Sequence, residues 1–299
     1  MDSTERLRRR IEVLGDLQSI VKTMKALSAV SIRQYRGSVL ALTDYYRTVE
    51  LGLHGVLRNV DYFHPPVYES GQQHLLAAVV FGSDYGLCGR FNEDVTSYAL
   101  EQIKATTEYS PRSQILAVGS RVKSHLESLG HAADADVPLA ASAAQIANTV
   151  QQVLVKIDHW RSEANLRYLY VFYNRMGQKG GYQPMSIKLL PMDLHRFRGL
   201  TQAPWPSRRL PTFTIDRQQL LTALVRQYFF VRIFRACAES QASEHASRLV
   251  AMQSAEKHLD ERKEELTTRF HRLRQDAITN EMLDIVSGFE AITADQALF

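Results

Sequence analysis

The chain begins with a long region in which apolar residues recur at intervals of three and four. This spacing places them on one helix face as a narrow seam, which is typical of helices that pair along their length. The seam residues are Leu7, Ile11, Leu14, Leu17, Val21, Met24 and Leu27. No proline occurs before Pro65. The pattern therefore predicts one helix over residues 3–59, about 80 Å long, within a first domain of residues 1–60.

A different rhythm marks the second domain, residues 74–195. Short apolar runs predict strands at residues 75–81, 115–118, 166–173 and 184–190. Helical patterns lie between them at residues 92–105, 121–129 and 142–161, with Asn92 as an N-cap and Gly130 as a C-terminal stop. This alternation favours an α/β fold, a Rossmann-like domain whose sheet is partly parallel and whose last two strands form an antiparallel hairpin.

The third domain, residues 212–299, reads as a second long helix. Before it, Pro204, Pro206 and Pro211 exclude regular helix, so residues 196–211 are expected to be a loop. Thr214 or Asp216 can cap the helix, and no proline follows. Its interrupted seam consists of Leu220, Leu224, Tyr228, Val231, Ala238, Ala242, Leu249, Met252, Leu259, Leu266, Phe270 and Leu273.

The two terminal helices are each other's best apolar partner, and they are expected to form an antiparallel coiled coil with the α/β domain inserted between them. The small residues Ala238 and Ala242 would allow close approach. The C-terminal helix is the longer one, so one end should protrude. Its residues Leu283, Ile285 and Val286 would then need an apolar sleeve supplied by another protein.

Composition narrows the class of protein. The 299 residues are 45% hydrophobic, but no apolar run approaches the roughly 20 residues that cross a bilayer. The first six residues do not resemble a secretory signal, and two distant cysteines indicate neither a disulfide framework nor a zinc site, so a cytoplasmic protein is expected. A net charge of +4 is low for a nucleic-acid binder. The positive charge is concentrated in two arginine clusters, which are either solvated or attract an acidic surface. The first cluster is Arg6, Arg8, Arg9 and Arg10, and the second is Arg196, Arg198, Arg208 and Arg209.

Residues 82–89, which read GSDYGLCG, follow a predicted strand and precede a helix, where a phosphate-binding loop would lie. The spacing matches neither the dinucleotide nor the P-loop motif, so a turn that needs its glycines for geometry is favoured. Cys88 is read as a small buried residue. The histidines show no metal-binding spacing, and no carboxylate pair suggests acid–base chemistry. We expect no catalytic site, cofactor or metal.

Three patches of the chain resemble the gamma subunit of F-type ATP synthases. They are residues 8–25 (RRRIEVLGDLQSIVKTMK), residues 83–92 (SDYGLCGRFN), and residues 247–255 (SRLVAMQSA) continued by residues 277–288 (AITNEMLDIVSG). The third patch is the most specific. The order of the patches spans nearly the whole chain. Fewer lysines after Met24 and a basic rather than acidic loop at residues 196–211 depart from the family pattern and suggest a divergent bacterial branch.

The resemblance implies a rotor shaft without its own active site. In that family the terminal helices turn inside a ring of alpha and beta subunits. The α/β domain sits on the c-subunit ring beside the epsilon subunit, at the cytoplasmic face of the inner membrane. Matching the patches assigns subunit contacts to Met24, Lys25, Arg248, Arg274, Gln275 and Thr279. Met24 could equally be seam packing, and Arg274 with Gln275 a solvated face. The alternatives are a coiled-coil adaptor, a nucleic-acid binder and a nucleotide-binding α/β enzyme.

Overall fold

The computed structural model describes residues 4–57, 74–107, 112–163, 165–177, 181–192, 205 and 211–296. The chain divides into two compact units. The central unit contains residues 28–249. The terminal unit contains residues 1–27 together with residues 250–299.

Two long helices begin in one unit and end in the other. Helix α1 spans Thr4–Leu57 and helix α6 spans Arg217–Gln296, as the periodic seams predicted. The predicted cap of α6 is confirmed at Asp216, whose Oδ2 accepts hydrogen bonds from the backbone N–H groups of Gln218 and Gln219 at 3.0 and 3.1 Å. Most of the loop predicted at residues 196–211 lies outside the described residues.

The central unit is built on a five-stranded sheet in the order β3-β2-β1-β4-β5. Strands β1 to β4 are parallel and β5 runs antiparallel to β4, which confirms the predicted closing hairpin. The strands are β1 (Leu75–Phe81), β2 (Arg112–Val118), β3 (Ala135–Val137), β4 (Leu166–Met176) and β5 (Tyr182–Leu190). No sequence pattern predicts β3, because three residues are too few to show a period.

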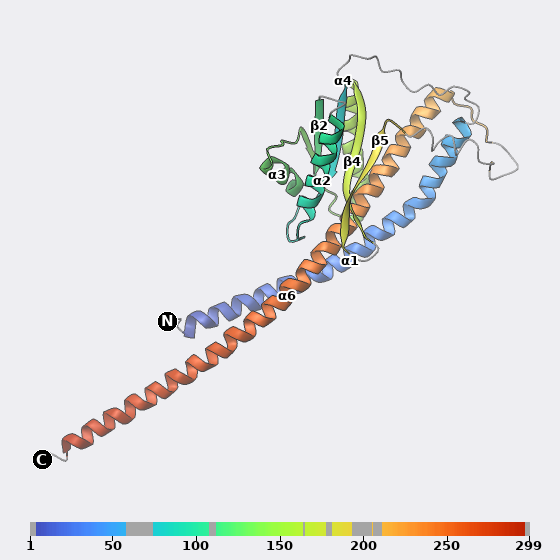
Figure 1. Ribbon diagram of the computed structural model, residues 1–299. Coiled ribbons are helices and arrows are strands. Elements are labelled where there is room, and N and C mark those ends of the chain that lie inside the picture. Colours follow the sequence, from blue (N-terminus) through green and yellow to red (C-terminus); the bar gives the residue numbers. More distant parts are fainter. Residues whose placement is uncertain are drawn as a thin grey trace. The chain divides into compact units, whose positions relative to one another are not determined.

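Helices cover both faces of this sheet (Figure 1). Helices α2 (Phe91–Thr107) and α3 (Ser120–Ser128) pack on one face. On the other face lie α4 (Ile146–Glu163), preceded by the short 3₁₀ turn η1 (Ala143–Gln145), and part of α6. All seven residues of β1 are buried, as expected for a central parallel strand. The α/β architecture is therefore confirmed.

Two predicted helix ends had different outcomes. Gly130 does terminate α3: its φ is 79°, and its N–H donates to the carbonyl of Glu127 at 3.0 Å. Asn92 is not an N-cap, since α2 already begins at Phe91. Its side chain instead reaches back to Ser83, where Oδ1 accepts the backbone N–H and Nδ2 donates to Oγ, both at 2.9 Å.

The small residues of α6 lie in the core of the central unit. Ala236, Cys237, Ala238 and Ala242 are buried in one cluster with strand residues of β1 and β4 and with Tyr35 of α1. Short side chains thus let α6 pack closely against both the sheet and α1.

In the terminal unit, polar pairs join α1 and α6. Gln18 bonds Asp260 and accepts a hydrogen bond from Lys263 at 2.9 Å, and Lys25 pairs with Glu256 at 2.5 Å. These pairs show that the two helices run in opposite directions. Leu7 and Val21 of the predicted seam are buried, as are Met252 and Leu266. Leu17 and Leu27, however, are largely exposed, so the apolar contact is narrower than the seam suggested.

Candidate partner-binding surfaces

The loop between β1 and α2, residues 82–89, is held rigidly at the carboxyl edge of the sheet. The Asp84 carboxylate accepts the N–H of Ser120 at 2.8 Å and that of Leu139 at 3.2 Å. Close approach explains the glycine at the start of the loop: a Cβ on Gly82 would lie 2.3 Å from Cβ of Val122. The predicted geometric role is confirmed for Gly82 and for Gly89, whose φ is 61°, but nothing close to Gly86 requires a glycine.

Helix α6 holds the same loop from its other side. Arg248 donates from Nη2 to the carbonyls of Tyr85 (3.2 Å) and Gly86 (3.3 Å), and from Nε to Gly86 (3.3 Å). One residue earlier, Ser247 Oγ donates to the carbonyl of Cys88 at 2.6 Å. Three loop carbonyls are thereby satisfied by two adjacent side chains of α6, so the loop conformation depends on this helix.

Arg248 belongs to a buried charged group on α6. Its Nη2 donates to Glu244 Oε1 at 2.6 Å, and both side chains are almost fully buried. Burial raises the pKa of Glu244 to about 7, although Arg248 opposes this shift. His245 is stacked on the ring of Tyr35, with centroids 5.5 Å apart. Burial first, and the charge of Arg248 second, lower the pKa of His245 to about 4.

The loop presents two large apolar side chains to solvent. Tyr85 is 76% exposed and Leu87 is 62% exposed. Leu87 also has a φ of 62°, an unusual value for a leucine, which the surrounding hydrogen bonds impose. Exposed apolar side chains on a rigid loop are typical of a protein contact.

The same loop is unsuited to nucleotide phosphates. The Asp84 carboxylate already occupies the N–H of Ser120, the first residue of α3, and the first turn of α2 carries Glu93 and Asp94. These negative charges lie where a phosphate would have to bind. Cys88 is buried, as predicted, and burial raises the pKa of its thiol, which makes it a poor nucleophile.

The far half of α6 forms a second surface, within the terminal unit. Every side chain described from residue 274 to residue 287 is exposed. The large apolar residues among them are Ile278, Met282, Leu283, Ile285 and Val286. An exposed apolar row on a helix that long is expected to be covered by other chains.

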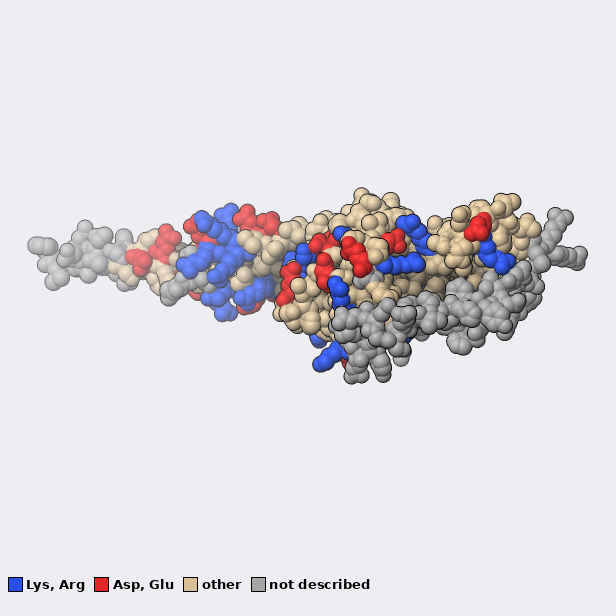
Figure 2. Space-filling model, turned by 90° about the horizontal axis from the view of Figure 1, so that it is seen from above, with Lys and Arg blue, Asp and Glu red and all other residues tan. Residues whose placement is uncertain are grey.

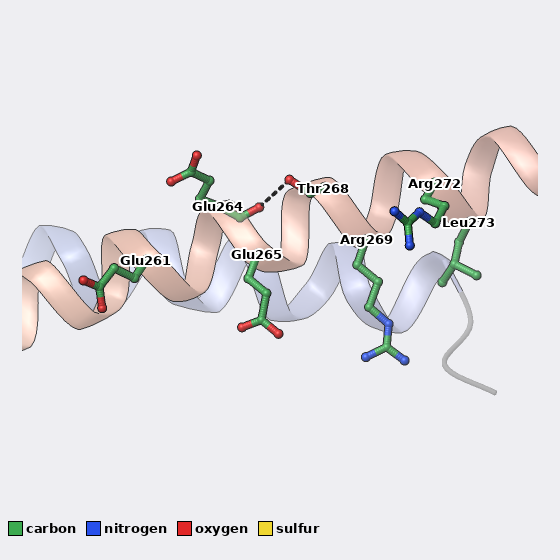
Figure 3. A pocket seen from close by; sticks show the side chains of 7 residues that line it. All are labelled: Glu261, Glu264, Glu265, Thr268, Arg269, Arg272 and Leu273. Atoms are coloured by element: carbon green, nitrogen blue, oxygen red, sulfur yellow. Dashed lines mark hydrogen bonds between the residues drawn. The ribbon is translucent and has the colours of Figure 1, made fainter.

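A charged groove of about 630 Å³ precedes this row on α6 (Figure 3). Glu261, Glu264 and Glu265 line one end, and Arg269 and Arg272 line the other. Among the described residues, positive and negative side chains are likewise interspersed over the face that Figure 2 presents. Such a pattern favours contacts that are specific in register yet weak individually.

The six sequence-predicted contact residues fall in different settings. Arg274, Gln275 and Thr279 lie together on the exposed part of α6, and Thr279 Oγ1 donates to the carbonyl of Gln275 at 2.9 Å. Met24 and Lys25 are half-buried on α1. Arg248 is 5% exposed and donates hydrogen bonds to Tyr85, Gly86 and Glu244 of the same chain.

Sequence reasoning missed the groups around Arg248. Glu244 and His245 carried no motif, and Tyr35 was only one position of a long helix. The sequence pattern also did not predict that Tyr85 and Leu87 are exposed. The available signal for an exposed apolar surface was the position of Tyr85 and Leu87 in a loop that contains three glycines.

Within the part of the chain that the structure describes, no group of three or more His, Cys, Asp or Glu side chains could hold a metal ion. No helix in that part is both long enough and apolar enough to span a bilayer.

Taken together, the fold is an α/β domain between two long terminal helices, and its candidate sites are surfaces for other proteins. Residues 3–292 match the family model described as ATP synthase. The chain therefore belongs to the ATP synthase family.

Its relatives specify the subunit. The chain is 26% identical to the ATP synthase gamma chain of Nitrosomonas europaea over 299 residues, covering 98% of this chain and all of that one. It is also 26% identical to the ATP synthase gamma chain of Bdellovibrio bacteriovorus, covering 98% and 99%. The predicted resemblance to gamma subunits is confirmed.

Solved structures agree on the fold. A chain of the Euglena gracilis mitochondrial ATP synthase rotor has a TM-score of 0.61 and 16% identity, covering 92% of this chain and 98% of that one. A chain of the F1/c-ring assembly from the same organism has a TM-score of 0.62, also at 16% identity, covering 98% and 95%.

Proposed function

We propose that this chain is the gamma subunit of a rotary F-type ATP synthase and forms its central shaft. In this role α1 and α6 act as an antiparallel coiled coil inside a ring of alpha and beta subunits. The Rossmann-like domain of residues 74–195 lies on the c-subunit ring beside the epsilon subunit. The chain is then peripheral to the membrane, at the cytoplasmic face of the inner membrane.

The observation that carries this proposal is that the side chains of the apolar row on α6 are exposed. Ile278, Met282, Leu283, Ile285 and Val286 are all about half exposed or more on a helix of 80 residues. An exposed apolar row of this kind marks a surface for other chains. A ring of alpha and beta subunits provides such a sleeve, and the likeness to a chain of the Euglena gracilis rotor supports this role.

The mechanism requires the shaft to favour one conformation of a beta subunit over another. A shaft that bound every conformation equally would shift none of them, however tightly it bound. Ion flow turns the c ring and shaft together, and an asymmetric shaft surface then meets each beta subunit in turn. The chain needs no nucleotide site for this task, since all its work is done by differential contact.

Individual residues have distinct proposed roles. Lys25 and Met24 face the moving lobe of beta from α1, where a half-buried cation can form a transient pair with an acidic surface. Arg274, Gln275 and Thr279 form a polar contact set on α6. Arg248 acts indirectly, because it holds the loop that presents Tyr85 and Leu87.

The direct test is co-expression with the alpha and beta subunits of the same organism, followed by size-exclusion chromatography and an ATP hydrolysis assay. We expect a stoichiometric complex whose turnover depends on this chain. If the chain elutes alone and folded, the proposal is wrong, and the adaptor reading would be preferred.

The contact set can be tested in the same complex. Replacing Arg274 and Gln275 together by alanine should lower turnover, because both side chains are exposed and, in the proposed role, contact a beta subunit. Arg161→Ala with Ser162→Ala, two exposed residues of α4, is the matched control and should leave turnover unchanged. Unchanged turnover and assembly in the Arg274/Gln275 variant would remove these residues from the mechanism.

A further inference from the structure

A separate cavity lies inside the central unit, between the β4–β5 hairpin and α6. Its volume is about 250 Å³. The lining comes from three elements: Tyr173 and Arg175 of β4, residues 185–187 of β5, and Arg232, Arg235 and Glu239 of α6. It shares no residue with the partner-binding surfaces described above.

The cavity carries an excess of positive charge. Three guanidinium groups line it, against the single carboxylate of Glu239. That carboxylate is already engaged at both oxygens. Oε1 accepts from Arg235 Nε at 2.8 Å, and Oε2 accepts from the Tyr173 hydroxyl at 3.0 Å, with Arg175 Nε 3.9 Å away. Glu239 therefore orients Arg235 without neutralising the group.

Arg232 gives the clearest sign of a missing acceptor. Its Nε atom is buried and has no hydrogen-bond partner among the described residues. Its guanidinium lies over the ring of Tyr228, 5.9 Å from the centroid, a contact that satisfies charge but not the N–H group. A buried donor left without an acceptor is costly, so native structures usually satisfy it with a ligand, water or ion.

We propose that this cavity binds a small tetrahedral oxyanion of the phosphate class. Guanidinium groups present paired N–H donors that match the oxygens of such an anion, and arginine clusters are the usual means of binding it. Donors from a strand and a helix converge on one partly open cavity, in which the side chains of Arg175 and Arg235 are half exposed, and Glu239 fixes the orientation of Arg235. The anion would also relieve the repulsion among the three arginines.

The test is isothermal titration calorimetry of the purified full-length chain with inorganic phosphate, at constant ionic strength maintained with chloride. We expect saturable binding of one phosphate per chain. Arg232→Gln should weaken it roughly 10-fold, since one charge-assisted hydrogen bond is lost. Arg175→Gln, a change on the exposed part of β4, should weaken it to a similar degree and protects the test if Arg232→Gln fails to fold.

The control is Arg226→Gln on the same helix. Arg226 is exposed, pairs with Asp158 at 3.4 Å and does not line the cavity, so phosphate affinity should not change. Competition by sulfate would support the oxyanion class. Absence of saturable binding, binding that both cavity variants leave intact, or equal weakening by Arg226→Gln would each overturn the proposal.

Discussion

Along α6, residues 228–248 and residues 274–287 differ in a way that hydrophobicity does not predict. The first stretch includes the small and polar sequence ACAESQAS, residues 236–243, yet seven of these eight residues are buried and the eighth, Glu239, is mostly so. The second includes isoleucine, methionine, leucine and valine, yet every side chain in it is exposed. Both stretches are regular helix.

Burial in the first stretch follows from shape and from satisfied polar groups. Small side chains let the backbone of α6 come close to the sheet, and Gln241 and Ser243 find carbonyl acceptors at Ala140 (3.1 Å) and Glu239 (2.8 Å). In the second stretch nothing within the described chain approaches the apolar row. One helix is thus a core element over residues 236–243 and an exposed, partly apolar surface over residues 274–287.

A matched pair of isoleucines sharpens this comparison most. Ile233 is fully buried in the core cluster, whereas Ile285 is 68% exposed. Ile233→Ala should lower the free energy of unfolding by about 4 kcal/mol, because it removes buried methyl groups and leaves a cavity. Ile285→Ala should change it by less than about 0.5 kcal/mol. Urea denaturation of the isolated chain measures both.

In the assembled complex, Ile285→Ala should have a larger effect than it has in the isolated chain. If alpha and beta subunits cover the end of α6, Ile285→Ala loses apolar contact there and should weaken assembly. A large loss of stability in the isolated Ile285→Ala chain would break the comparison, because it would show that this stretch is already packed.

The buried ion pair gives the next largest effect. At pH 8, Arg248→Met removes the charge and the hydrogen bond that lower the pKa of Glu244, so the buried carboxyl must stay ionised without a partner or take up a proton, and the loss should cost about 3 kcal/mol of unfolding free energy. Adding Glu244→Gln should restore part of the loss, since the unpaired charge is then gone. A double variant no more stable than Arg248→Met would show that the lost loop hydrogen bonds, and not the charge, dominate.

Periodicity and residue type were sufficient for most of the fold. The long helices, the parallel strands and the closing hairpin follow from spacings of three and four and from apolar runs. Asn92 was assigned wrongly because its side chain has two possible uses, as a cap or as a link to Ser83, and only tertiary packing selects between them. The seam overstated the contact of Leu17 and Leu27, since spacing fixes a helix face but not its partner.

The candidate site was less accessible to sequence reasoning. Arg248 could be singled out through the resemblance, but its buried position depends on a loop some 160 residues away. The same holds for Tyr35 and His245, which stack across 210 positions of sequence. Contacts between residues so distant leave no local pattern in a single sequence. Exposed apolar residues at the end of α6, in contrast, were predictable, because no other segment remained to cover them.

The pH dependence of stability tests the buried group more finely, through two variants with opposite expected slopes. In the folded chain the pKa of His245 is lowered to about 4, so its contribution to stability is present above its unfolded value of 6.5 and is lost as the pH falls toward 4. The pKa of Glu244 is raised to about 7, so its contribution is greatest below its unfolded value of 4.5 and is lost as the pH rises to 7. The two effects oppose each other.

Relative to wild type, His245→Asn should therefore lose stability as the pH rises from 4.5 to 6.5, and Glu244→Gln should gain it, each by roughly 2 kcal/mol. Arg248, which faces both groups, keeps its charge throughout this range. Urea denaturation at pH 4.5, 5.5 and 6.5 gives the slopes. Equal slopes in both variants would contradict the assignment of these titrations.

The smallest effect concerns the pair Lys25–Glu256, which joins α1 to α6 in the terminal unit. Its side chains are 34% and 20% exposed, so solvent screens the attraction only in part. A double-mutant cycle with Lys25→Ala and Glu256→Ala should give a coupling energy of about 0.5–1 kcal/mol at low salt, decreasing at high salt. The control cycle pairs Glu256→Ala with Lys22→Ala, an exposed lysine one turn away, and should give none. If coupling is as large for Lys22, general electrostatic attraction holds the helices and the polar pairs have no specific part. If coupling is confined to Lys25, specific but weak pairs set the register of the terminal unit, in contrast to the apolar core that fixes α6 in the central unit.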